Sequence, residues 1–467
     1  MTVLAQSRWR QPYTWMLVGL TLLLLIVGTQ YIAKSGEDRS AFNRWRNQVQ
    51  GLIQGEDVYA KYNYPNAPIM GLILYPLSVL PRMTMGSVTI DLGAISWFIL
   101  KIGMTVLTFH WVVRLVAAQG VAFPFWAQAV MLAFSLRPIV GDLSHGNVNL
   151  LIMFLVVGAV YAFRTRKDNL AGLTLALAIT CKVTPALFVP YFLWKRAWKT
   201  LAATLVGLGL FFVVVPGSIL GYAHTIKITR TWVERMILPF TMHGEVTTEH
   251  NNQSLPGLIY RLTTHSPSFL DDDDQPLPEG YYNWFNLAPD TARLMVKVCG
   301  AAFLLFLVLM GRTPTSDRAH PLLAAEYALV VLGMLLFSER TWKHHCVTLI
   351  LPFGVICYHW AVGGLSVRLR SVLLGSCLLA TLIMATTSTS LWETLAQYKM
   401  GAKLAQVYGA YVWAYFILLG STTIILICSP WRMGHNQQSS RRAARFSPQP
   451  YPMSSQPLTK SATESTR

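Results

Sequence analysis

The stretch GDLSHGNVNLLIMFL, residues 141–155, places a polar turn directly before an apolar run. The turn supplies an acid, Asp142, an imidazole, His145, and two amides, Asn147 and Asn149. Polar side chains that face hydrocarbon are costly, so such a cluster is expected only where protein or water surrounds it. The stretch therefore predicts a buried or water-filled site at the mouth of a membrane helix, suited to chemistry or transport.

The composition of the whole chain indicates a membrane protein. Of its 467 residues, 53% are hydrophobic and 13% are charged, against roughly 25% charged residues in soluble domains. The net charge of +17 lies in short loops and the tail, where it sets orientation, so we expect no nucleic-acid binding. The six cysteines show no paired-ligand spacing, which predicts neither disulfides nor zinc.

Apolar stretches of about 20 residues predict transmembrane helices from end to end. The predicted spans are 13–33, 88–117, 121–138, 147–163, 199–220, 292–311, 321–337, 345–362, 370–388 and 408–429. With both termini on one side, every short basic loop faces that side, which the positive-inside rule assigns to the cytoplasm. The first span is expected to stay in place and to target the chain to the cell membrane. We expect a membrane domain over residues 1–431 and a disordered cytoplasmic tail over 432–467.

One segment, LAGLTLALAITCKVTPALFVPYFLW (170–194), is long enough to span but has basic loops at both ends. Pro185, Lys182 and Thr184 interrupt its apolar run, which predicts a broken pair of half-helices that enters and returns. Residues 68–80 are too short to cross and are expected to be interfacial or re-entrant. The predicted fold class is an all-α polytopic membrane protein.

The polar motifs then gather on the extracytoplasmic side. They lie in the loops 34–87 and 221–291, in the turn 139–146 and in the segment 338–344. The run Asp271–Asp274 lacks the spaced ligands of a calcium loop, so we interpret it as solvated charge and expect no metal.

Five motifs, in order along the chain, resemble glycosyltransferase family 87. They are GEDVYAKYNYPNAPIMGLILYPLSVLP (55–81), GDLSHGNVNLLIMFL (141–155), the break CKVTP (181–185), NNQSLPGLIYRL (251–262) and FSERTWKHHCVTLILPF (337–353). The resemblance covers roughly residues 13–360. It implies a GT-C fold with about 10–12 transmembrane helices and a re-entrant or broken helix pair.

The activity implied by this resemblance is sugar transfer outside the cytoplasm. Members of the family take a sugar, mostly mannose, from a polyprenyl-monophosphate carrier and attach it with inversion to a lipid or glycan acceptor. The expected partners are thus the lipid-linked donor, the acceptor and membrane lipids, with no cofactor. The alternatives are a transporter or flippase for polyprenyl-linked glycans and a glycan ligase, since a broken hairpin around a lysine also suits a secondary transporter.

Such a reaction needs a base for the acceptor hydroxyl and cationic groups for the phosphate. The resemblance places the base just beyond the first span, where Asp38 lies, and Asp57 is the alternative. Lys182 is expected to meet the donor phosphate, because a lysine in an apolar segment costs about 2.5–3.5 kcal/mol on insertion scales. The other interpretations of Lys182 are snorkelling and an ion pair with Asp142.

The remaining candidates bind substrate. His344 and His345 open an apolar span beside Trp342; at most one of these adjacent histidines is expected to face the site, with His345 counted as catalytic. The turn residues His145, Asn147 and Asn149 are candidate donors to phosphate or sugar, although Asn147 also suits a helix cap. From the loop 221–291 come candidate acceptor or phosphate ligands, namely Asn252, Gln253 and Arg261.

Overall fold

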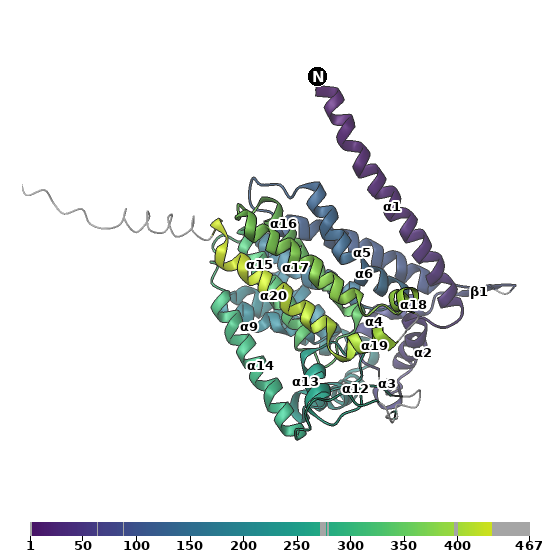
Figure 1. The fold of residues 1–467 in the computed structure, drawn as a ribbon. Coiled ribbons are helices and arrows are strands. Elements are labelled where there is room, and N and C mark those ends of the chain that lie inside the picture. The colour runs from purple at the N-terminus through teal and green to yellow at the C-terminus, as the bar shows by residue number, and fades with distance from the viewer. Residues whose placement is uncertain are drawn as a thin grey trace, which may run out of the picture.

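A computed structural model of the chain describes residues 2–62, 64–86, 88–270, 277, 280–396 and 400–431. It is a bundle of helices with one two-stranded hairpin (Figure 1). The predicted tail, 432–467, and the run Asp271–Asp274 lie outside the described residues.

Seven helices in the described part of the chain are long and apolar enough to cross a membrane. They are α1 (Thr2–Gly36), α5 (Leu92–Val116), α10 with η2 and α11 (Trp198–Gly209, Leu210–Val214, Val215–Leu220), α14 (Pro289–Met310), η5 with α16 (Lys343–Leu349, Ile350–Val362), α17 (Val367–Ala385) and α20 (Ala410–Cys428). The shorter apolar helices are α4 (Pro68–Ser78), α7 (Asn149–Arg164), α8 (Asp168–Cys181) and α15 (Pro321–Leu336). The all-α, multi-pass membrane architecture is therefore confirmed.

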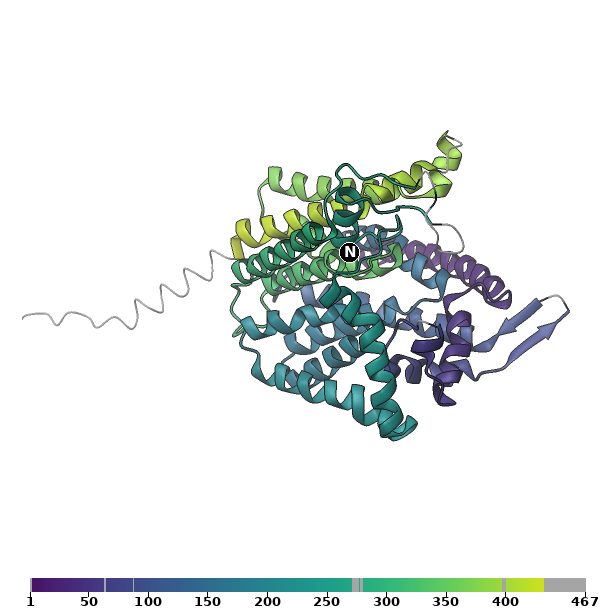
Figure 2. The ribbon, with the colours of Figure 1, turned by 90° about the horizontal axis from the view of Figure 1, so that it is seen from below.

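Two predicted span boundaries are wrong. The helix predicted to begin at residue 88 begins only at Leu92, because residues 88–91 form the strand β2 (Val88–Asp91). This strand is paired antiparallel with β1 (Arg82–Met85). Gly86, with φ of +63°, makes the turn between them, and this hairpin protrudes from the helices (Figure 2). The helix predicted to end at residue 138 extends further, because α6 (Phe125–His145) continues through Pro138 to the polar turn.

The broken helix pair has the predicted form. The helix α8 ends where Lys182 becomes extended, and η1 (Thr184–Leu187) and α9 (Phe188–Trp194) follow. The segment 313–318 contacts both the start of α8 and the end of α9. Arg318 pairs with Asp168 at 2.6 Å, and Lys195 donates to the carbonyl of Thr313, also at 2.6 Å. The chain therefore enters and returns on the same side of the bundle.

The remaining helices are short and lie between the apolar ones along the chain. They are α2 (Ala41–Ile53), α3 (Val58–Tyr62), α12 (Tyr222–Trp232), η3 (Val233–Ile237), η4 (Pro239–His243), α13 (Leu255–Thr263), α18 (Thr389–Ala396) and α19 (Met400–Val407).

The core and the outer surface differ as a membrane fold requires. Every residue of α15 is buried, and α7 and α16 pack around the same centre. In contrast, only 11% of the apolar windows of α1 and α14 is buried. Because these outer helices stay apolar while exposed, hydrocarbon is the solvent that suits them. In Figure 1, α1 stands away from the bundle over its N-terminal half.

Candidate functional site

The main cavity, here called the outer cavity, has a volume of about 360 Å³. It forms where three distant segments meet: the end of α1 with the start of α2, the turn between α6 and α7, and the start of η5. Its lining comprises Lys34, Asp38, Arg39, Ser40, Ala41, Arg44, Ser144, His145, Asn147, Trp342 and His344. Five of the residues predicted from sequence are thus brought together, although up to about 300 residues separate them along the chain.

The turn of the outer cavity depends on Gly146. This residue ends α6 with φ of +69°, a left-handed conformation that glycine adopts without steric cost. A Cβ atom here would lie 2.7 Å from the hydroxyl oxygen of Tyr31. Trp97 donates from Nε1 to the Gly146 carbonyl at 3.2 Å. The backbone between His145 and Asn147 is therefore fixed closely against α1 and α5.

The imidazoles and the turn meet across the outer cavity. The side-chain amide nitrogen of Asn147 lies 2.9 Å from Nε2 of His344. The rings of His145 and His344 stack with centroids 5.6 Å apart, and Trp342 meets His344 edge to face. These contacts line one wall with polar nitrogens beside an indole, groups that suit a phosphate oxygen and a sugar ring.

Asp38 also lines the outer cavity, with 63% of its side chain exposed. Its backbone has φ of +56°, which is uncommon for a residue with a Cβ atom. Arg82, from the base of the β1–β2 hairpin, pairs with its Oδ1 at 2.9 Å, and Asn43 donates to the same oxygen at 3.2 Å. The carboxylate is therefore both oriented by neighbours and open to the cavity.

Three cations that line the outer cavity were not predicted as site residues from the sequence; they are Lys34, Arg39 and Arg44. Arg39 pairs with Glu37, whereas Lys34 and Arg44 have no ion pair within the described residues. One signal could have identified them: basic residues just beyond the first span are out of place on the side that the positive-inside rule leaves poor in charge. Burial, and then the nearby charge of Lys34, lowers the pKa of His145 from its ordinary value.

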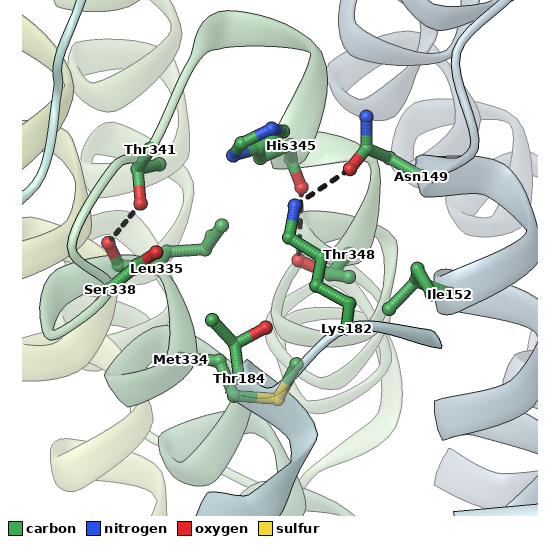
Figure 3. Close-up of a pocket in the computed structure, with 10 residues that line it drawn as sticks. All are labelled: Asn149, Ile152, Lys182, Thr184, Met334, Leu335, Ser338, Thr341, His345 and Thr348. Atoms are coloured by element: carbon green, nitrogen blue, oxygen red, sulfur yellow. Dashed lines mark hydrogen bonds between the residues drawn. The ribbon is translucent and has the colours of Figure 1, made fainter. Parts of the chain in front are cut away.

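A second, inner cavity lies behind the first and has a volume of about 20 Å³ (Figure 3). Such a volume has room for about one water molecule. Lys182 reaches into it and donates to the Oδ1 of Asn149 at 2.9 Å. His345 also lines it, and its Nδ1 accepts from the backbone N–H of Trp342 at 3.2 Å. The two adjacent histidines therefore face different cavities.

Asp142 pairs with Lys101, not with Lys182. The Nζ of Lys101 lies 3.3 Å from Oδ1 of Asp142, and both side chains are fully buried. The alternative interpretation of Lys182 as the partner of Asp142 is therefore wrong. Lys101, in the middle of α5, was not a candidate from the sequence because no motif surrounds it.

Asp57 is absent from the lining of the outer cavity. Its Oδ1 accepts from the backbone N–H of Ala60 at the start of α3, and its Oδ2 accepts from the hydroxyl of Thr231 on α12 at 3.1 Å. These contacts join α3 to α12. A catalytic role for Asp57 stays a prediction that this geometry does not favour.

Asn252, Gln253 and Arg261 are fully buried and bonded to protein. All three nitrogens of the Arg261 guanidinium donate to backbone carbonyls, including those of Val407 and Gln406. Asn252 accepts from the backbone of Thr341 and donates to the Glu339 carbonyl, and Gln253 donates to the carbonyl of Gln406. These residues hold the loop 221–291 against the segment before η5 and against the end of α19, and no acceptor or phosphate reaches them in this arrangement.

No group of three His, Cys, Asp or Glu side chains suited to a metal ion occurs in the part of the chain that the structure describes. The lining of the outer cavity offers a carboxylate, two imidazoles, one amide and several cations, which suit proton transfer beside a phosphate.

Comparisons with known proteins agree with this chemistry. A family model, glycosyltransferase family 87, matches residues 62–339. A polyprenol-phosphate-mannose-dependent alpha-(1-2)-phosphatidylinositol mannoside mannosyltransferase of Mycolicibacterium smegmatis is 27% identical over 315 residues, which cover 63% of this chain and 60% of the relative. An alpha-(1->3)-arabinofuranosyltransferase of Corynebacterium glutamicum is 25% identical over 268 residues, covering 54% and 57%.

Among solved structures, ArnT from Cupriavidus metallidurans bound to undecaprenyl phosphate matches with 14% identity and a TM-score of 0.35, over 92% of this chain and 81% of that one. The matches to the curated relatives span between 55% and 61% of their lengths.

Proposed function

The chain belongs to glycosyltransferase family 87, and on that premise we propose that it transfers a sugar from a polyprenyl-monophosphate carrier to a lipid or glycan acceptor in the outer cavity. The observation that carries the proposal is that one cavity holds an exposed carboxylate together with two cations, Lys34 and Arg44, that have no ion pair among the described residues. A phosphate leaving group needs the first, and an acceptor hydroxyl needs the second.

Lys34 and Arg44 are the proposed ligands of the donor phosphate. Neither has an ion pair within the described residues, so neither must give up a partner when an anion binds. His145 and Asn147 add neutral hydrogen-bond donors from the facing wall. As the bond between sugar and phosphate breaks, negative charge grows on the phosphate oxygen, and cations already in position stabilise that charge.

Asp38 is the proposed base. Its carboxylate takes the proton of the acceptor hydroxyl while that oxygen attacks the anomeric carbon. The bond from the anomeric carbon to the phosphate oxygen breaks, and the polyprenyl phosphate leaves with the electron pair. A single displacement of this kind inverts the configuration at the anomeric carbon, which agrees with one accessible carboxylate in the cavity.

Mannose is the proposed sugar, because four of the relatives are polyprenol-phosphate-mannose-dependent mannosyltransferases. Trp342 offers an indole face to a sugar ring. The arabinofuranosyltransferase relative makes arabinofuranose the sugar to test next. The acceptor is proposed to be a membrane glycolipid or glycan.

The proposed location is the cell membrane, with the outer cavity extracytoplasmic and both termini cytoplasmic. The basic segments that include Arg164, Lys195 and Arg318 lie at the end of the bundle opposite the cavity, where the positive-inside rule puts the cytoplasm.

Lys182, which the sequence predicts to meet the donor phosphate, lines the inner cavity, which has room for about one water molecule. We therefore propose that it acts on the phosphate only through Asn149 and the turn.

The test is donor turnover by the full-length protein in lipid nanodiscs, with polyprenyl-phosphate-[¹⁴C]mannose and a membrane lipid extract as acceptor. Wild type is expected to form labelled glycolipid. Asp38→Asn, verified as folded by its melting temperature, is expected to bind the donor and to lose about 10²–10⁴-fold in transfer rate. Donor translocation across proteoliposomes without any labelled product would overturn the proposal in favour of a flippase, and full activity of Asp38→Asn would remove Asp38 as the base.

A further inference from the structure

A chain of hydrogen-bonded polar side chains, three of them fully or almost fully buried, joins Lys101, Asp142, Asn149 and the half-buried Lys182. It begins at Lys101 on α5, whose Nζ donates to the backbone carbonyl of Asp142 at 2.9 Å and lies 3.3 Å from its Oδ1. The other carboxylate oxygen of Asp142 accepts from the backbone N–H of Asn149 at 3.3 Å and from its side-chain amide at 3.1 Å. The Oδ1 of Asn149 accepts from Lys182 at 2.9 Å. Four helices, α5 to α8, are joined in this way.

The link between Asp142 and Asn149 closes the turn that lines the outer cavity. Ser144, His145 and Asn147 all lie between these two residues. Asp142 is the fourth-last residue of α6, and Asn149 is the first of α7. This bonded carboxylate therefore ties the two helix ends together and helps to fix the position of His145 and Asn147.

The helix α5 holds the same turn at a second point. Trp97 lies one helical turn before Lys101 and donates from its indole nitrogen to the Gly146 carbonyl at 3.2 Å. Two side chains on one face of α5 thus fix the start and the middle of the turn. Neither Lys101 nor Trp97 lines the outer or the inner cavity.

A buried ion pair is a poor source of stability, because desolvation of the two charges offsets most of their attraction. A lysine retained in the interior of a membrane helix is instead a marker of function. We propose that Lys101 is a positioning residue for sugar transfer: through Asp142 it holds His145 and Asn147 in the geometry that receives the donor phosphate. This inference rests on the proposed function.

The test removes both charges together, in Lys101→Met/Asp142→Asn, so that no unpaired charge stays buried. The amide oxygen of the new side chain at position 142 can still accept from Asn149. The matched control is Lys195→Met/Glu326→Gln, which neutralises another buried pair, 2.6 Å apart and with side chains 5% and 1% exposed, far from both cavities. Each full-length protein is measured for melting temperature, donor KM and kcat, and amide hydrogen exchange over residues 140–150.

In the Lys101/Asp142 variant we expect donor KM to rise about tenfold through misplacement of the turn, with a melting temperature close to wild type and faster exchange over residues 143–149. The Lys195/Glu326 control should change neither KM nor this exchange. Unchanged KM and exchange, or equal changes in both variants, would overturn the inference.

A second variant covers the case in which the double variant does not fold. Trp97→Phe removes the indole N–H that bonds to Gly146 but keeps an aromatic ring, and it should raise donor KM in the same direction. If wild type transfers no sugar, the proposed function fails, whereas the exchange readout still tests whether Lys101 orders the turn.

Discussion

The outer and inner cavities share two short segments, the end of the turn between α6 and α7 and the start of η5, but have opposite character. Asn147 and His344 line the outer cavity, whereas Asn149 and His345, two residues and one residue further along, line the inner one. The outer cavity holds cations without ion pairs and an exposed carboxylate. The polar groups of the inner cavity are bonded to one another and to the backbone.

This difference separates binding from support. A group that is to receive a ligand must be open to a site large enough for it, as Lys34 and Arg44 are. A buried polar group whose bonds are made within the protein fixes geometry and is costly to disturb. Chemical type alone does not distinguish the two, because each cavity has its own lysine, histidine and asparagine.

The largest expected effect is removal of the free cations of the outer cavity. Lys34→Ala/Arg44→Ala should raise donor KM by about 100-fold or more, because each charge-assisted contact to phosphate is worth roughly 1.5–3 kcal/mol. Initial rates against donor concentration measure it. Arg230→Ala is the control and should leave KM unchanged, because it removes an exposed arginine of α12 that pairs with Glu234 of η3. A normal KM in the double variant would mean that the phosphate binds elsewhere.

The next effect tests the turn that lines the outer cavity. Gly146→Ala forces a left-handed residue to carry a Cβ, at about 1–2 kcal/mol, and pushes that Cβ against Tyr31. We expect a lower melting temperature together with a lower transfer rate. Gly300→Ala on α14, where a Cβ meets nothing within 4 Å, is the control. Unchanged melting would show that the turn relaxes freely.

The adjacent histidines give the sharpest comparison. His344→Ala removes a group of the outer cavity and should lower kcat/KM about tenfold or more. His345→Ala should lower the melting temperature, because the Trp342 N–H loses its acceptor, and should leave kcat/KM of the folded fraction near wild type. Steady-state kinetics with thermal melts on both variants decide it. The reverse pattern would restore His345 as the catalytic histidine.

A smaller effect is expected at Lys182. Lys182→Met leaves the Oδ1 of Asn149 without its donor but also removes a buried charge, so the two changes in stability oppose each other. Donor KM should change far less than in the Lys34/Arg44 variant when both are titrated side by side. A rise of equal size would mean that Lys182 meets the phosphate, as predicted from the sequence.

The smallest effect concerns pH. Because the pKa of His145 is lowered in the folded protein, the unfolded chain takes up this proton more readily. The stability that neutral His145 contributes is therefore complete above its ordinary pKa of 6.5 and is lost as pH falls below it. Between pH 7.5 and 5, the melting temperature should fall less steeply for His145→Gln than for wild type. Parallel curves of melting temperature against pH would contradict the lowered pKa.

The fold was largely predictable from the sequence because hydrocarbon allows few structures. Apolar length alone located α1, α14, α17 and α20, and the polar interruption at Lys182 located the broken pair. The β1–β2 hairpin was missed, since its alternating residues run directly into the apolar helix α5.

The candidate site was predictable only in part. Asp38, His145, Asn147, Trp342 and His344 were identified by residue type and motif, and the structure brings them together. The structural role of Arg261 was not predictable, because the carbonyls that accept its hydrogen bonds, at residues 406 and 407, are about 145 positions away along the chain. The division of neighbouring residues between two cavities depends on where a turn gives way to a helix, which a list of polar residues does not contain.

The position of α1 has a consequence for the reach of the carrier's tail. Its end supplies Lys34 to the outer cavity, while apolar side chains such as Leu22 and Leu25 remain more than half exposed along its span. A donor whose phosphate is held at Lys34 can therefore leave its isoprenoid chain in the bilayer alongside α1. The length of the isoprenoid chain then does not affect binding of the phosphate, so we expect carriers with long and short isoprenoid chains to be used equally well as donors.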